Sequence, residues 1–104
     1  MMFQEMVSVT TEEELHAYGI IRAICCREVP FEDIYLRDAK TYCAILYQDN
    51  NRKPIVRLFF DRKVPRIIIF DPERKEQIFD IERVDDIYRY AEQLCARVRA
   101  LKAA

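Results

Sequence analysis

The sequence predicts an α+β domain in which one N-terminal helix, an antiparallel meander of about four to five strands and one C-terminal helix form a single domain, residues 1–104, with both helices on one face of the sheet. Apolar residues recur at helical spacing near both ends of the chain, runs rich in Ile, Val, Phe and Tyr fill the middle, and the connections between these runs are short. With a hydrophobic fraction of 51% and a single glycine, 104 residues have the size and composition of one ordered domain.

The first helix is expected from about Glu12 to Arg27. The stretch TTEEE at residues 10–14 places a hydroxyl three residues before a carboxylate, which satisfies free amide groups at a helix start. Pro30 disfavours helical geometry at the residue before it, so the helix has to end there. Apolar residues recur at helical spacing along it, at Leu15, Tyr18, Ile21, Ile24 and Cys25.

Five strands are expected near residues 34–37, 41–47, 55–60, 66–70 and 76–81. β-branched and aromatic residues are concentrated in these runs, and polar clusters separate them. The clearest turn covers residues 48–54, where Asp and Asn tolerate turn geometry and Pro54 cannot donate to a strand ladder. Because the connections are short, neighbouring strands should pair antiparallel.

The second helix is expected beyond Arg83. Acidic residues occupy its first turn and basic residues its last turns, which suits the helix dipole. Its apolar stripe consists of Val84, Ile87, Ala91, Leu94, Val98 and Leu101.

The sheet has a second face that two helices on one side cannot cover. In the runs at 41–47 and 66–70, both alternating sets of side chains are apolar or aromatic. One interpretation is that this face meets a partner, either a preceding domain of a longer polypeptide or a second copy of the chain. The alternative is that sheet twist and long Arg or Lys side chains cover it.

Charge and cysteine content restrict the function classes. The net charge of −1, from 17 basic and 18 acidic residues, gives no global positive field, so any contact with DNA has to come from a local patch. The four cysteines lack zinc or redox spacing and are expected to be buried thiols. No apolar stretch approaches the length of a membrane span and no apolar signal segment follows Met1, so we expect a cytoplasmic protein without a membrane partner.

A nuclease site is one hypothesis for residues 49–63. Asp49 and Asp61 would supply oxygen ligands to Mg²⁺, and Lys63 would orient water and stabilise charge on the phosphate. The D-x-K spacing fits, because residues two apart on a strand point to the same side. The same spacing also occurs at residues 38–40 and 73–75, and Lys63 is next to a turn signal at 64–65. A solvated hairpin turn is therefore the competing interpretation, in which no cofactor is needed.

A nucleic-acid surface is the other site hypothesis. Basic residues in the strand half of the chain alternate with tyrosines, and basic groups hold phosphates while aromatic rings stack on bases. An ordinary charged sheet surface is the alternative. His16, the only histidine, has no second histidine or cysteine at metal spacing and is expected at the surface. The residues chosen for nucleic-acid contact are Arg37, Lys40, Tyr42, Arg52, Lys53 and Arg57.

Four stretches together resemble a known family: VTTEEEL at 9–15, YLRDAKTY at 35–42, DNNRKPIVRL at 49–58 and VDDIY at 84–88. They are similar to the C-terminal domain of type I restriction enzyme R-subunit-like proteins, described as restriction endonucleases, over about residues 7–98. In that family the PD-(D/E)xK nuclease signature lies in a preceding domain. The resemblance therefore implies an accessory module, and no catalytic residue carries over to this chain.

The leading hypothesis is a non-catalytic accessory domain of a restriction-endonuclease-like, DNA-processing protein. It would support DNA engagement or assembly through the sheet, without a cofactor. The alternatives are a small Mg²⁺-dependent nuclease that uses Asp49, Asp61 and Lys63, and a module for homo-oligomerisation.

Overall fold

The computed structural model describes residues 10–104, and its first element is helix α1, Glu12–Cys25. Thr11 caps it: the Thr11 Oγ1 accepts from the Glu14 N–H at 3.1 Å, and the Glu14 carboxylate accepts from the Thr11 N–H at 2.8 Å. The predicted start is confirmed, and the helix ends two residues before the predicted Arg27. Leu15 does not belong to the buried stripe, since it is 52% exposed.

The sheet has five antiparallel strands in the order β1-β2-β3-β4-β5, which confirms the meander. Its strands are β1 Ile34–Asp38, β2 Cys43–Tyr47, β3 Pro54–Phe59, β4 Arg66–Phe70 and β5 Glu76–Asp80, and a short 3-10 helix, η2 Phe31–Asp33, precedes β1. The predicted turn at 48–54 includes two residues with positive φ, Gln48 and Asp49. A bulge in β3 leaves Ile55 without a partner in the pairing with β2, and both Ile55 and Val56 are buried in the core.

The C-terminal helical region divides into a 3-10 helix, η3 Val84–Tyr90, and helix α2, Ala91–Ala103. The sequence predicted one continuous helix here. Its first apolar residues, Val84, Ile87 and Tyr90, are three apart, and residues at that spacing align in a 3-10 helix. Tyr90 stacks on Phe79 of β5, with ring centroids 4.1 Å apart. The predicted apolar stripe still faces the core through both segments.

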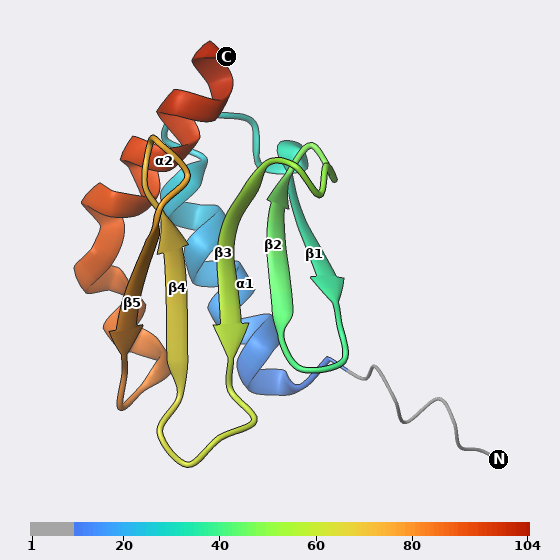
Figure 1. Ribbon diagram of the computed structural model, residues 1–104, viewed down its shortest axis with the longest axis vertical. Coiled ribbons are helices and arrows are strands. Elements are labelled where there is room, and N and C mark those ends of the chain that lie inside the picture. The colour runs from blue at the N-terminus through green and yellow to red at the C-terminus, as the bar shows by residue number, and fades with distance from the viewer. Residues whose placement is uncertain (1–9) are drawn as a thin grey trace, which may run out of the picture.

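Both α-helices lie on one face of the sheet, as predicted (Figure 1). The buried apolar residues of α1, η3, α2 and the strands form one core cluster between the two layers. The predicted domain, 1–104, and the family resemblance, about residues 7–98, both begin outside the described residues. Neither α-helix within residues 10–104 is long and apolar enough to cross a membrane.

The cysteines are free thiols, and three of the four are buried as predicted. Cys26 is exposed and is the C-cap residue of α1. Burial, together with a smaller effect of the neighbouring Cys95, raises the pKa of the Cys25 thiol to about 12. The buried Cys25 is therefore a packing residue and not a nucleophile.

Candidate functional site

The side of the sheet away from the helices is named the open face. Register places Arg37, Ala44, Arg57, Ile68 and Ile78 opposite one another in one row across all five strands. The alternate residues of these strands face the helices and form the core. The other open-face residues are Tyr35, Leu46, Phe59, Arg66, Phe70, Glu76 and Asp80.

Arg57 occupies the centre of the open face and packs among aromatic rings. Its guanidinium carbon lies 5.2 Å from the Tyr42 ring centroid and 5.1 Å from that of Phe70. The Tyr42 ring also contacts Phe59, with centroids 5.4 Å apart. Cation–π contacts of this kind hold an arginine side chain flat over apolar surface. The centre of the face is therefore covered by the chain's own residues.

Two large apolar side chains of the open face stay exposed. Tyr35 on β1 is 43% exposed and Ile78 on β5 is 54% exposed, whereas Leu46 and Ile68 between them are buried. β1 and β5 are the two edge strands. The sequence left two interpretations of this face, cover by long side chains or contact with a partner. Arginine side chains cover its centre, whereas apolar surface stays exposed at its two edges.

Every arginine on the open face is paired with a carboxylate. Arg37 Nη2 lies 2.8 Å from Asp49 Oδ1, and the hydrogen bond between the two raises the pKa of Arg37. Arg57 Nη1 lies 3.8 Å from Glu76 Oε2. These exposed pairs add little stability, but they neutralise the positive charge that a phosphate would need.

The third pair joins Arg66 to Asp80. Arg66 Nε donates to Asp80 Oδ1 at 2.8 Å. This hydrogen bond lowers the pKa of Asp80. The open face is therefore aromatic and close to neutral.

The six residues predicted to contact nucleic acid do not form one patch. Arg37, Arg57 and the Tyr42 ring lie on or beside the open face. Lys40 lies in the turn between β1 and β2, whereas Arg52 and Lys53 lie in the turn between β2 and β3, at the other end of the sheet (Figure 1). A five-residue strand separates these two ends by about 17 Å.

The three residues of the nuclease alternative are not brought together. Asp49 lies in the turn before β3, whereas Asp61 and Lys63 lie in the connection after it, so the two carboxylates are at opposite ends of a strand about 20 Å long (Figure 1). Shared ligation of one Mg²⁺ requires oxygens within about 2–3 Å of the ion. Asp49 is also bound to Arg37. The fold therefore does not bring the two carboxylates together for a shared metal ion, because sequence proximity does not show at which end of a strand a residue lies.

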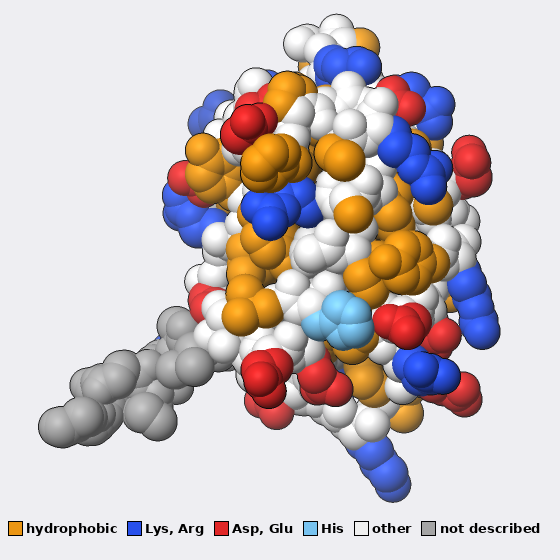
Figure 2. Space-filling view, turned by 180° about the vertical axis from the view of Figure 1, so that it is seen from behind, with side chains coloured by type: hydrophobic (Ala, Val, Ile, Leu, Met, Phe, Trp, Pro, Cys, Tyr) orange, Lys and Arg blue, Asp and Glu red, His pale blue; other side chains and the backbone are white. Residues whose placement is uncertain are grey.

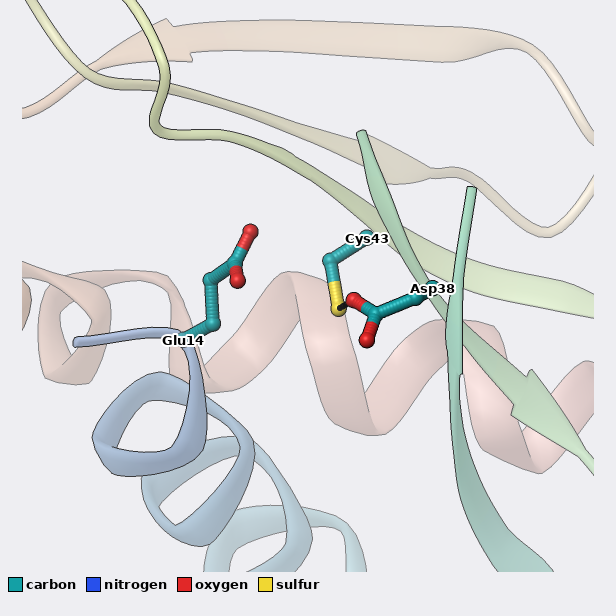
Figure 3. A group of neighbouring side chains, drawn as sticks. All are labelled: Glu14, Asp38 and Cys43. Atoms are coloured by element: carbon teal, nitrogen blue, oxygen red, sulfur yellow. Dashed lines mark hydrogen bonds between the residues drawn. The ribbon is translucent and has the colours of Figure 1, made fainter. Parts of the chain in front are cut away.

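A group that the sequence analysis missed joins α1 to the first hairpin. One carboxylate oxygen each of Glu14 and Asp38 and the Cys43 Sγ, atoms of the kind that ligate metals, lie within 4.8 Å of one another (Figure 3). The Cys43 Sγ donates to Asp38 Oδ1 at 3.4 Å, and the Thr10 hydroxyl donates to the other Asp38 oxygen. Burial raises the pKa of the Cys43 thiol, and this hydrogen bond raises it further. The thiol is therefore protonated at neutral pH and serves as a hydrogen-bond donor.

Part of this group could have been found from the sequence. Asp38 and Cys43 are opposite each other in the first hairpin, whose two strands were predicted near residues 34–37 and 41–47. No pattern in the sequence indicated that Glu14 lies near Asp38 and Cys43, because only the packing of α1 on the sheet brings the three together. The Glu14 carboxylate is itself used in the helix cap.

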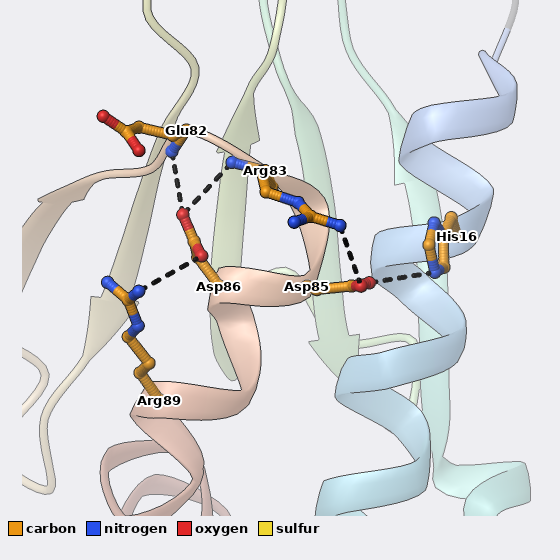
Figure 4. A network of polar contacts seen from close by, with 6 residues as sticks. All are labelled: His16, Glu82, Arg83, Asp85, Asp86 and Arg89. Atoms are coloured by element: carbon orange, nitrogen blue, oxygen red, sulfur yellow. Dashed lines mark hydrogen bonds and ion pairs between the residues drawn. The ribbon is translucent and has the colours of Figure 1, made fainter.

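A polar network joins the start of η3 to α1 (Figure 4). Asp85 lies 3.6 Å from His16 and 3.8 Å from Arg83. Asp86 accepts from the backbone N–H groups of Glu82 and Arg83 at 3.0 and 3.1 Å, and these bonds lower the pKa of Asp86. His16 is exposed, as predicted. The network satisfies free amides at a helix start and has no catalytic geometry.

The helical side of the molecule carries charges of both signs interspersed with apolar side chains (Figure 2). A shallow groove of about 290 Å³ on α1 is lined by Gly19, Arg22, Ala23, Cys26 and Phe31. Arg22 covers part of it, with its guanidinium 5.1 Å from the Phe31 ring centroid. The groove holds a single charged side chain and no convergent polar groups.

No model of a protein family, no curated protein and no solved structure matches this chain.

Proposed function

We propose that this chain is a non-catalytic accessory module that docks a protein partner on the open face of its sheet. The observation that carries this proposal is the composition of that face: tyrosine, phenylalanine and arginine side chains packed on one another, with each arginine paired to a carboxylate. Aromatic residues and arginine are enriched in protein interfaces, and such residues are their usual energetic centres.

Assembly is better supported than DNA engagement. A surface that binds the DNA backbone needs several unpaired basic groups on one face. The arginines of the open face are paired, and the predicted basic residues Lys40 and Arg52 lie at opposite ends of the sheet. The resemblance to restriction enzyme R-subunit-like proteins supports a place in a DNA-processing assembly, beside a separate nuclease domain, in which this module contributes binding.

A DNA titration tests which class of partner the module takes. Fluorescence anisotropy with a labelled duplex of about 20 base pairs in about 20 mM salt is expected to show no saturable binding. The matched variant, Arg52→Ala with Lys53→Ala, should behave identically. Salt-sensitive binding that this variant weakens would overturn the proposal in favour of a nucleic-acid module.

Site-specific photo-crosslinking in the native host tests the docking surface. A benzophenone amino acid at Tyr35, on the open face, is compared with the same group at Tyr88, an exposed tyrosine of η3. Crosslinks to protein are expected from position 35 and not from position 88, and Arg57→Ala should abolish them while the circular dichroism spectrum stays unchanged. Equal crosslinking from both positions, or crosslinks that nuclease treatment removes, would contradict the proposal.

A further inference from the structure

The outer edge of β5 is an unpaired strand edge. The hydrogen bonds from Asp71 N to Lys75 O, 2.8 Å, and from Ile81 N to Pro65 O, 2.9 Å, fix the alternation of its ladder with β4. Backbone groups of residues 77 and 79 therefore point to β4, and those of residues 76, 78 and 80 point outward. No side chain or loop among residues 10–104 bonds to these outward groups.

The other sheet edge is partly closed. The Ile34 N–H of β1 bonds to Phe31 O, and the Tyr18 hydroxyl donates to Ile34 O. Two of the outward backbone groups of β1 are thereby used within the chain. β5 is the edge that offers a complete set of donors and acceptors to another strand.

The exposed side chains of β5 define what a strand added there would meet. Ile78, opposite Ile68 in the register, extends the apolar surface around Ile68 to the edge of the open face. Glu76 and Asp80 stand on either side of it on the same face, and both are exposed. Their arginine partners lie inward on β3 and β4, so an incoming strand meets the two carboxylates first.

A second copy of the chain is a poor match for this edge. Antiparallel self-pairing centred on Ile78 would place Glu76 opposite Asp80 of the copy, twice, and like charges directly opposite destabilise a strand pair. Carboxylates on an edge strand are a common means of preventing self-association. The same two carboxylates would attract a strand that carries basic residues at the matching positions.

We propose that the β5 edge accepts an extended segment of a partner protein as a sixth strand. The segment alternates basic, any, apolar, any and basic residues, so that its apolar side chain packs on Ile78 and its basic side chains pair with Glu76 and Asp80. This inference rests on the proposed function and specifies one form of partner. Main-chain hydrogen bonds supply the affinity, and the alternating side chains supply the selectivity.

Peptide titration of the ¹⁵N-labelled chain tests the proposal. The probe is the capped pentapeptide KTITK, compared with ETITE and with a KTITK peptide N-methylated at its central residue. KTITK is expected to shift the amide signals of residues 76, 78 and 80 most, and to bind about tenfold more tightly than ETITE, because two attractive charge pairs replace two repulsive ones. The N-methylated peptide should bind more weakly, since it lacks a ladder donor.

Two variants make the test specific. Glu76→Lys with Asp80→Lys should reverse the preference, so that ETITE binds more tightly. Ile78→Pro removes an outward N–H without removing a bond to β4 and should abolish binding of KTITK, with the retained fold checked by circular dichroism. Equal binding of the two charged peptides, shifts centred elsewhere, or no shift at about 5 mM peptide would overturn the proposal.

The outcome is separable from that of the proposed function. Arg57→Ala should abolish crosslinking from position 35. Because it frees the Glu76 carboxylate from its ion pair, it should not weaken binding of KTITK at β5. Failure of the peptide test with intact crosslinking removes the sixth strand alone. Salt-sensitive DNA binding removes the proposed function itself.

Discussion

Replacement of Arg97 by methionine should destabilise the fold more than replacement of any exposed arginine. Arg97 is 3% exposed although it lies on α2 among residues that the sequence assigned to the helix dipole. Its Nε donates to Pro54 O at 2.8 Å, and its Nη1 donates to Asp71 O at 3.1 Å. These bonds join α2 to the first residue of β3 and to the connection between β4 and β5. Burial lowers the pKa of Arg97, and no described carboxylate forms an ion pair with it.

The magnitude follows from the two bonds. A hydrogen bond from a charged donor contributes about 1.5–3 kcal/mol, and a buried carbonyl left without a donor costs about 1–3 kcal/mol. Methionine keeps apolar contact with Phe70, over which Arg97 lies at 5.9 Å, and avoids the cost of burying a charge. The expected net loss in the free energy of unfolding is about 2–4 kcal/mol, a large part of a stability of about 5–15 kcal/mol.

Urea denaturation followed by circular dichroism measures this loss. With an m-value of about 1.5 kcal/mol/M, the midpoint of Arg97→Met should fall by roughly 2 M. Arg97→Lys keeps a charge but cannot reach both carbonyls, so its urea midpoint should lie between those of the unchanged protein and Arg97→Met. Arg99→Met is the matched control: Arg99 is two residues further on the same helix, half exposed, and pairs with Glu28 at 3.8 Å. It should change stability by less than about 0.5 kcal/mol. If Arg97→Met were as stable as this control, the two hydrogen bonds would not stabilise the fold.

Three further outcomes follow from the core, the caps and the thiols. Leu58→Ala should lower the free energy of unfolding by about 2–5 kcal/mol, because Leu58 is fully buried at the centre of the core; an unchanged urea midpoint would contradict this packing. Backbone hydrogen bonds hold the pKa of Asp86 below its unfolded value, so its contribution to stability is present at neutral pH and lost as pH falls through the folded pKa. Asp86→Asn should therefore lower the melting temperature at neutral pH and flatten its fall in acid, whereas parallel pH curves for the two proteins would refute this assignment. A thiol reagent should label Cys26 rapidly in the folded protein, and Cys25 with the other two buried cysteines only on unfolding; rapid labelling of all four would show that the buried thiols are accessible.

The sequence by itself determined the elements and their order. Residues a few positions apart predict the Thr11 cap, the strands and the apolar stripe that begins at Val84. This is possible because capping joins residues three positions apart and the periodic pattern repeats over one or two turns. The short connections then allowed only an antiparallel meander. One local feature was missed, the division of the last helix at Tyr90, although the spacing of three in its first part indicates it.

Only the tertiary structure decided which side chains meet. Asp49 and Asp61 have similar sequence contexts, but they lie at opposite ends of β3. Arg37 and Arg57 are separated by two turns, but the register aligns them in one row with their carboxylate partners within reach. Arg97 has the sequence context of a surface residue, but packing of α2 on the sheet buries it. The physical reason is that ion pairing, burial and the exposure of an edge depend on residues distant in sequence, which local propensity does not specify.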